Sequence, residues 1–306
     1  MIVTRNSEEV IGLCLDALAK MAPQFTPVVV DNASTDDTLQ RVRAHEGVRV
    51  IANLENRGFA AAVNQGVEVT DADLILLLNP DVTLLTAVDT LVEASEKYGL
   101  AAGKLVDITG RGQAGFTIRR FPTAASLIFE LFGINRLWRS NPVNRRYRYL
   151  DKNLDEAGVV EQPAGAFLMF RRDVWRQLGG WDEEFYPIWF EDVDFCRRAV
   201  GAGFRIQYIP DASASHIGGH SVTQVPASSR AGYWCASLIR YASKHFREPG
   251  YRGVCAAVVF SSIPRMVAGM MLARSLAPIS AYSKIVRFAG LRLVSARRPG
   301  VKRIRS

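Results

Sequence analysis

The chain has 306 residues, of which 48% are hydrophobic and 22% are charged, and this is enough for one large α/β domain or two smaller ones. Its four cysteines are far apart and show no C-x-x-C spacing, which excludes a cysteine zinc site and a disulfide framework and indicates reduced thiols in a cytosolic setting. We expect no signal peptide, because "MIVTRN" leads directly into a strand-like segment.

The net charge of +8 is unevenly distributed. Residues 239–306 contain fourteen Lys and Arg and one acidic residue, a balance of +13, so residues 1–238 carry −5. A basic tail of this kind predicts a polyanionic partner, either nucleic acid or an anionic membrane. The tail lacks the interleaved aromatic residues of single-strand binders, so we expect no nucleic acid partner.

The first third of the chain alternates between strand-like and helical patterns. Strands are expected at 28–30, 48–53 and 73–81, and helices at 34–45, 60–69 and 86–99, with Ser34 and Asp37 resembling a capping box at the first helix. Such alternation predicts a mostly parallel sheet with helices on both faces. Ligands of these sheets bind at the carboxyl ends of the strands, where the polar turns at 31–37 and 79–81 are expected to lie.

The middle of the chain has two different patterns. Residues 111–152 contain nine Arg and Lys, two acidic residues and little periodicity, and we interpret them as a mobile or irregular segment. A strand is expected within 159–175, a helix that begins at 191 and ends near Gly201 or Gly203, and another strand over 205–210.

The tail from about 251 is apolar but interrupted by charges. Its longest charge-free run, residues 253–264, lies between Arg252 and Arg265 and contains Pro264. A spanning helix needs about 20 residues, so helices lying in the membrane interface are favoured over an ordinary transmembrane helix. The final "SARRPGVKRIRS" would add attraction to anionic lipid of roughly 1 kcal/mol per basic residue. The alternative is a helical cap on the core followed by a disordered basic end.

Polar residues at two strand ends are candidates for a ligand site. Asp31 either accepts a hydrogen bond from the ring of a nucleobase or simply forms the turn with Asn32 and Ser34, and its chemistry leaves both readings open. "LLLNPDV" delivers Asp81 to the end of an apolar strand, where one carboxylate and substrate phosphates commonly hold Mg²⁺ or Mn²⁺.

Two further segments carry chemistry. "ENRGFAAAVNQG" places Asn56, Arg57 and Gly58 ahead of a helix, where backbone N–H groups and an arginine favour a diphosphate. Two histidines flank a glycine pair in "SHIGGHS", a pattern that suits a metal and a phosphate. The chain has neither G-x-G-x-x-G nor a P-loop, which argues against a dinucleotide oxidoreductase and a P-loop NTPase.

"EDVDFCRR" places three carboxylates within four residues, directly after Trp189 and Phe190. Such a cluster suits a charged helix start, a metal site or the base of an enzyme. We assign Asp194 to the helix start, where the helix dipole favours a carboxylate.

These segments occur in the same order in family 2 glycosyltransferases of the GT-A type, and over residues 1–246 the chain resembles their bacterial rhamnosyltransferase branch most. The resemblance rests on "VDNASTDDT", "NRGFAAAVNQG", "LLNPDV", "GAFLMFRRDVWRQLGGWDEEF", "FEDVDFCRRAVGAGF" and "HIGGHS". It implies a GT-A nucleotide-diphospho-sugar transferase fold over residues 1–246, with a nucleotide-sugar half at 1–110 and an acceptor and catalytic half at 111–246. Residues 247–306 would form a basic amphipathic, membrane-associating region.

The resemblance also implies roles for individual residues. Asp192 matches the catalytic base, with Glu191 beside it as an orienting neighbour or substitute. Asp81 and His216 match the metal site. The implied donor-binding residues are Asp31, Asn32, Asn56, Arg57, Gly58, Asn64, Asn79 and Asp81. The acceptor site would take Gly165, Ala166, Trp181, Asp182 and Trp189, although Trp181 suits the core equally well. Asn79 departs from the family pattern by replacing the first acid of its D-x-D motif. The chain also begins a few residues later than the relatives' first strand, so the true start is expected upstream.

The expected reaction is transfer of a sugar, with inversion, from a nucleotide diphosphate donor to a hydroxyl of a cell-envelope glycan or polyprenyl-diphosphate-linked acceptor. L-rhamnose from dTDP-rhamnose is the donor suggested by the branch, and Mg²⁺ or Mn²⁺ the cofactor. The expected location is cytoplasmic, on the inner face of the cell membrane. A sugar-nucleotide nucleotidyltransferase and a non-catalytic membrane-bound scaffold are the alternatives. The first would carry a Gly-rich basic loop after the first strand, which "VTRNSEEVIG" lacks.

Overall fold

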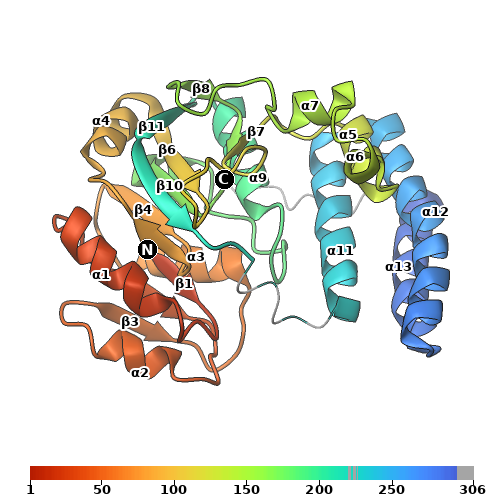
Figure 1. Ribbon diagram of the computed structural model, residues 1–306, viewed down its shortest axis with the longest axis horizontal. Helices are drawn as coiled ribbons and strands as arrows, with labels where there is room; N and C mark the ends of the chain where they lie inside the picture. The colour runs from red at the N-terminus through yellow and green to blue at the C-terminus, as the bar shows by residue number, and fades with distance from the viewer. Residues whose placement is uncertain (220–221, 223–224, 226, 295–306) are drawn as a thin grey trace.

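A mixed sheet forms one half of the protein, and a group of long helices forms the other (Figure 1). The computed structural model describes residues 1–219, 222, 225 and 227–294. The nine strands of the sheet have the order β3-β2-β1-β4-β10-β6-β11-β5, and β8 pairs with β11. Their bounds are β1 Ile2–Thr4, β2 Val28–Asp31, β3 Arg49–Ala52, β4 Leu74–Leu78, β5 Val82–Leu84, β6 Gly99–Val106, β8 Gly158–Val160, β10 Phe167–Arg171 and β11 Arg205–His216.

Strands β1 to β4 are parallel, as the alternating pattern predicts, and β10 enters antiparallel between β4 and β6. The pairing of Phe167 with Leu78 places the start of β10 beside the end of β4. The Asn79 N–H donates to the Ala166 carbonyl at 3.1 Å. Two segments that are far apart in the sequence therefore meet at one edge of the sheet.

Helices cover both faces of the sheet: α1 (Ile11–Met21), α2 (Thr38–Arg43), α3 (Phe59–Glu68), α4 (Asp89–Tyr98), α8 (Arg172–Gln177) and α9 (Glu191–Gly201). Strand β4 explains why two cores form. Leu76 and Leu78 belong to the cluster beneath α1 and α4, whereas Ile75 and Leu77 belong to the cluster beneath α3 and α9. A strand buried on both faces needs an unbroken apolar run, which is the pattern of "LILLL".

The prediction of a mobile or irregular segment over residues 111–152 is wrong. The segment contains β7 (Ile118–Arg119), which pairs with β9 (Gln162–Pro163), and the helices α5 (Ala124–Leu131), α6 (Ile134–Leu137) and α7 (Pro142–Tyr147). Thr123 and Ser126 form a capping box at α5, and Asn141 caps α7 ahead of a proline at its first position. The buried Leu127 and Leu131 of α5 then pack in a third core with the C-terminal helices.

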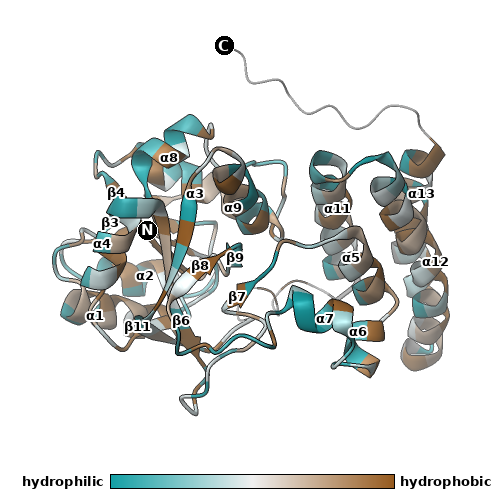
Figure 2. Ribbon diagram, turned by 90° about the horizontal axis from the view of Figure 1, so that it is seen from above, coloured by the Kyte–Doolittle hydropathy of each residue, from teal (hydrophilic) through white to brown (hydrophobic). Residues whose placement is uncertain are grey.

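The C-terminal helices are α11 (Ala227–His245), α12 (Glu248–Ala273) and α13 (Ala277–Val294), and they lie at the side of the molecule away from the sheet (Figures 1 and 2). Their shared core with α5 includes Leu238, Tyr251 and Val258. The charges at Arg252 and Arg265 were expected to disfavour a spanning helix, yet α12 runs unbroken through both positions and through Pro264. In length and composition, Glu248–Leu272 is sufficient to cross a membrane, with 33% of the apolar window buried against the protein. The basic end from 295 to 306 lies outside the described residues.

Candidate active site

Two cavities adjoin each other at the carboxyl edge of the sheet. We call the first the sheet-edge cavity; it is lined by the ends of β1 and β4 and by the loops before α3 and α9. The larger one, the α9 cavity, lies between β10, α5, the β7–β9 ribbon and the start of α9. The residues lining both cavities are Phe59, Asn79, Ile188, Gly219 and Val222. A ligand in one cavity can therefore reach a ligand in the other.

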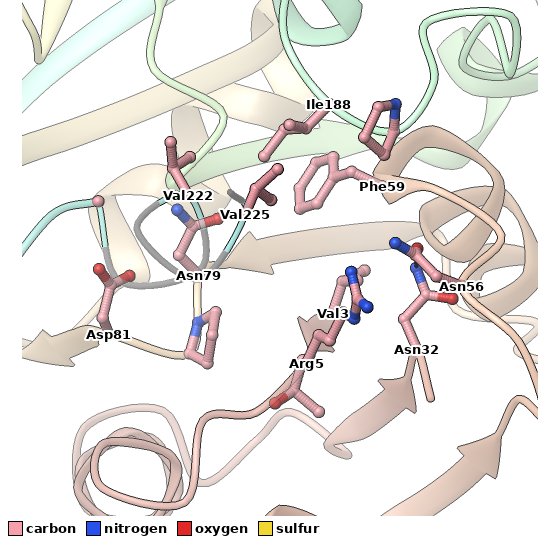
Figure 3. A pocket seen from close by; sticks show the side chains of 14 residues that line it. Val3, Arg5, Asn32, Asn56, Phe59, Asn79, Asp81, Ile188, Val222 and Val225 are labelled. Atoms are coloured by element: carbon pink, nitrogen blue, oxygen red, sulfur yellow. Dashed lines mark hydrogen bonds between the residues drawn. The ribbon is translucent and has the colours of Figure 1, made fainter. Parts of the chain in front are cut away.

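Amide side chains form one wall of the sheet-edge cavity. The Asn32 amide donates to Asn56 Oδ1 at 2.8 Å, and Asn32 Oδ1 accepts from the Arg57 N–H at 2.9 Å. Asn56 Oδ1 also accepts from the Gly58 N–H. These bonds fix the loop ahead of α3. In Figure 3, Asn32 and Asn56 lie on one side of the cavity, and Asn79 and Asp81 on the other.

Four predicted donor-binding residues do not line either cavity: Asp31, Arg57, Gly58 and Asn64. The Asp31 carboxylate accepts from the backbone N–H and hydroxyl of Ser34, at 3.1 and 2.5 Å. Ser34 therefore does not cap α2, which begins at Thr38. Asp31 does lie at the end of β2, as expected, and its role in binding a nucleobase stays a prediction.

The structure corrects the role of Asn64. Its amide nitrogen donates to the Trp181 carbonyl and to Glu183, while its oxygen accepts from Trp175 Nε1 and the Trp181 N–H, all at 2.8 to 3.0 Å. The side chain is buried and its hydrogen-bonding capacity is used within the protein. Asn64 therefore ties α3 to the loop before α9 and has no capacity left for a nucleotide.

Asp81 and His216 face one another, with Asp81 Oδ1 at 3.6 Å from His216 Nε2. Gln113 donates its amide N–H to the His216 carbonyl at 2.7 Å, so its oxygen accepts from His216 Nδ1 at 3.0 Å. That arrangement leaves the lone pair of Nε2 toward the carboxylate. Burial lowers the pKa of His216, only partly offset by Asp81, and so favours the neutral ring that binds metals.

Two electron-pair donors facing each other at 3.6 Å, too far apart for a hydrogen bond, suit a shared divalent cation. Among the described residues, no three or more His, Cys, Asp or Glu side chains gather into a metal cluster. A cation at Asp81 and His216 would therefore take its other ligands from water and from substrate phosphates, the usual arrangement for Mg²⁺.

Asp192 lies in the α9 cavity at the first turn of α9. Its Oδ2 accepts from the Gly165 N–H at 3.1 Å, and its Oδ1 accepts from the Val193 N–H at 2.8 Å. A Cβ at Gly165 would lie 3.1 Å from the Asp192 Cβ, so glycine permits this close approach. Burial raises the pKa of Asp192, against the effect of these two hydrogen bonds and of the Arg119 charge. A carboxylate with a raised pKa and access to a cavity is suited to accept a proton.

Glu191 lines the same cavity and is buried, with only 4% of its surface exposed. Its Oε2 has no hydrogen-bond partner among the described residues. Burial first, and then the Asp192 charge, raise its pKa well above the usual carboxyl value. Repulsion between the two charges therefore disfavours ionisation of Glu191 and Asp192 at the same time.

Asp194 is fully buried and points toward α11 instead. It contacts Arg198 at 2.8 Å and both Lys244 and His245 at 2.7 Å. Burial raises its pKa, but His245, Arg198 and Lys244 outweigh that effect and hold the pKa well below the usual range. Asp194 does lie in the first turn of α9, as predicted, but ion pairing to α11 is its main interaction.

The predicted acceptor residues separate into two groups. Gly165, Ala166 and Trp189 line the α9 cavity. Trp181 is 2% exposed and packs on Phe195 with ring centroids 4.9 Å apart, so it belongs to the core. Asp182 pairs with Arg240 and Lys244, at 2.7 and 2.6 Å, and lines neither cavity. Trp181 and Asp182 are therefore removed from the acceptor site.

Several residues of the site were not predicted from the sequence: Arg5, Phe59, Arg119 and Gln162 line the cavities, and Gln113 holds His216 in place. The excess of arginine over 111–152 was a signal for Arg119, but the segment was interpreted as irregular. Gln113 and Gln162 carry no recognisable spacing, because only the fold brings them to the site.

The fold is the GT-A type. A mannosyltransferase from Pyrobaculum calidifontis, solved with GDP-mannose and Mn²⁺, superposes with a TM-score of 0.51 and 16% identity over 96% of this chain and 85% of that one. The model of the family "Glycosyl transferase family 2" matches residues 1–179, and that of "Glycosyl transferase family group 2" matches residues 155–286. The chain therefore belongs to glycosyl transferase family 2, and the predicted family, fold and enzyme class are confirmed.

Two curated relatives are rhamnosyltransferases by name. The N-acetylglucosaminyl-diphospho-decaprenol L-rhamnosyltransferase of Mycobacterium tuberculosis is 29% identical over 240 residues, covering 71% of this chain and 75% of that protein. The rhamnosyltransferase WbbL of Escherichia coli is 26% identical over 232 residues, covering 72% of this chain and 83% of that protein.

Proposed function

We propose that this enzyme transfers L-rhamnose from dTDP-rhamnose, with inversion, to a hydroxyl of a sugar linked through a diphosphate to a polyprenyl lipid. The observation that carries this proposal is the junction of the two cavities, with Asp81 in the first and Asp192 in the second. The names of the two rhamnosyltransferase relatives support the choice of sugar and acceptor.

In the proposed reaction the acceptor sugar occupies the α9 cavity, and its hydroxyl gives a proton to Asp192 as its oxygen attacks the anomeric carbon. General-base catalysis of this kind contributes about 10²–10⁴-fold. The bonds from Gly165 and Val193 hold the carboxylate in one orientation, and Glu191, which favours the protonated state, keeps a second negative charge away from it.

The donor nucleotide occupies the sheet-edge cavity, where Asn32 and Asn56 hold the loop ahead of α3 and Arg5 provides a positive charge. Asp81 and His216 would hold Mg²⁺ or Mn²⁺. A divalent cation supplies charge stabilisation to the departing diphosphate.

Membrane attachment is proposed through α12 and α13. Their outer side chains include Phe260, Leu272 and Leu291, which are 62%, 87% and 61% exposed. Glu248 is the one acidic residue in these two helices, which also carry several basic residues. Apolar side chains with interspersed cations are typical of helices that lie in an anionic membrane interface. The proposed location is the inner face of the cell membrane.

The attachment is tested by flotation with vesicles of phosphatidylcholine and phosphatidylglycerol. Phe260→Ser, Leu272→Ser and Leu291→Ser combined should release the protein from vesicles, whereas Leu13→Ser, an equally exposed leucine on α1, should not. Substitutions on the outer surface are used instead of removing α12 and α13, since α12 shares a core with α5 and α11. Unchanged flotation of the triple variant contradicts the attachment.

The donor is tested by hydrolysis and thermal-shift measurements with dTDP-rhamnose, UDP-glucose, UDP-N-acetylglucosamine and GDP-mannose, each with Mg²⁺ or Mn²⁺. Selective hydrolysis of dTDP-rhamnose, and stabilisation by dTDP with metal, are expected. Preference for another sugar nucleotide would replace the proposed donor, and a lack of response to every nucleotide would contradict the transferase mechanism as a whole.

A further inference from the structure

The α9 cavity has a wall that the proposed reaction does not use. The β7–β9 ribbon forms it, with Arg119 paired opposite Gln162. Both residues line the cavity together with Asp192. One of them carries a charge and the other a buried amide, so the wall has the chemistry of a binding site.

Arg119 differs from the arginines near it. Its Nε donates to the Gly115 carbonyl at 2.7 Å and its guanidinium lies over the Phe116 ring, 5.5 Å from the centroid. Within the described part of the chain, no carboxylate forms an ion pair with it and its terminal nitrogens have no hydrogen-bond partner. By contrast, Arg148 pairs with Glu130 and Arg120 pairs with Glu161. Arg119 therefore keeps an oriented positive charge available to a ligand.

Gln162 provides a second, independent observation. The residue is 2% exposed, and its Nε2 donates to the Pro163 carbonyl at 3.0 Å. Its Oε1 has no partner among the described residues. A buried carbonyl oxygen without a donor costs about 1–3 kcal/mol, so a ligand hydroxyl at this position would remove a penalty.

We propose that Arg119 binds the phosphate attached to the acceptor sugar, and that Gln162 Oε1 accepts a hydrogen bond from a hydroxyl of the same sugar. This assignment rests on the proposed function, in which a diphosphate is bonded directly to the sugar that is modified. The anionic group then lies one sugar ring away from the hydroxyl at Asp192, and Arg119 and Asp192 line one cavity. Arg119 does not line the sheet-edge cavity, where Arg5 is the available cation for the donor.

The test compares two acceptors in steady-state kinetics: N-acetylglucosamine linked through a diphosphate to farnesol, and the neutral octyl glycoside of the same sugar. In Arg119→Gln, the KM for the diphosphate acceptor should rise about 10- to 100-fold, the equivalent of about 1.5–3 kcal/mol for hydrogen bonds to a charged group. KM for the octyl glycoside and for the donor should change less than about twofold, because neither ligand places a phosphate at Arg119.

Two variants serve as controls. Arg120→Gln removes the neighbouring arginine, which pairs with Glu161 and does not line the cavity, and should leave both acceptors unaffected. Arg119→Lys should recover part of the affinity, since it keeps the charge but loses the planar fork. An equal loss for both acceptors, or a rise in KM for the donor instead, overturns the assignment.

A binding measurement separates this inference from the proposed function. Calorimetric titration of the farnesyl-linked sugar diphosphate in the presence of dTDP requires no turnover. Wild-type binding that weakens about 10- to 100-fold in Arg119→Gln supports the assignment even if rhamnosyl transfer is never observed. Absence of binding to the wild type, or equal binding to the two proteins, overturns it.

Discussion

The two sides of the first turn of α9 show how the same residue type acquires opposite properties. On the cavity side, Asp192 has a raised pKa and retains access to a ligand. On the α11 side, Asp194 contacts three basic side chains and has a strongly lowered pKa. The two residues are separated by one position. The surroundings of each carboxylate, and not the residue type, decide which one is suited to catalysis.

The contrast has a physical origin in the partners that each side offers. Toward α11, Arg198, Lys244 and His245 compensate the cost of burying a charge. Toward the cavity, Asp192 receives two backbone N–H groups and no ion pair within the described residues, which is weaker compensation. Asp192 is therefore less stable as an anion than an exposed carboxylate, and it accepts a proton more readily.

The largest expected effect comes from Asp192→Asn. Removing the proposed base should lower kcat by about 10²–10⁴-fold, because the amide cannot accept the hydroxyl proton. The affinity for dTDP should be unchanged, since the donor occupies the other cavity. Stopped-point assays and dTDP titration measure the two properties. Turnover near the wild-type value in a folded Asp192→Asn protein would contradict the assignment of Asp192 as the base.

Asp194→Ala should lower the stability of the protein and leave catalysis by the folded enzyme intact. It leaves Lys244 and His245 without their buried partner, and breaking such a pair costs about 3–5 kcal/mol of unfolding free energy. Activity per folded molecule should persist at low temperature. Arg252→Ala, which breaks an exposed pair with Glu248, is the matched control and should cost less than about 0.5 kcal/mol in urea unfolding. Equal midpoints for Asp194→Ala and the wild type would contradict the structural role of Asp194.

A third prediction extends the comparison to the proposed metal site, where Gln113 fixes the orientation of His216. Gln113→Ala should raise the Mn²⁺ concentration needed for half-maximal activity by about 10- to 100-fold, the usual effect of losing such a supporting hydrogen bond. At saturating Mn²⁺, kcat should recover, and EDTA should abolish activity in both proteins. Full activity in the presence of EDTA would exclude the metal role of Asp81 and His216.

The smallest effect is expected for Glu191→Gln. The folded-state pKa of Glu191 is raised, so its contribution to stability is present below the unfolded value of about 4.5 and is lost as pH rises toward the folded pKa. Glutamine should therefore raise the melting temperature by a few degrees at pH 8 and by less at pH 4.5, where the glutamate is protonated in the fold. Melting curves at the two pH values decide; a shift independent of pH would contradict the raised pKa.

Much of the sheet was predictable because its signals are local. The strands and helices predicted between residues 28 and 99 correspond to β2, β3, β4, α2, α3 and α4, whereas α1 and β5 were not predicted. The helical segment at 111–152 was missed although its caps at Thr123 and Asn141 are also local, because its charges and prolines are equally typical of irregular structure. The roles given to Asn64, Trp181 and Asp182 could not be judged from the sequence, since their partners lie far away along the chain.

Local patterns in the sequence were sufficient to predict the family, the strand ends that carry Asn79 and Asp81, and the position of the carboxylates at the start of α9. These features depend on patterns within short segments, which can be recognised without knowing how the segments pack together. The fold was needed to show that Asp192 faces a cavity and Asp194 faces α11, and that Arg119 and Gln162 form a wall beside Asp192. Burial and charge pairing arise between segments that meet only in the fold, and they set the pKa and the accessibility of each group.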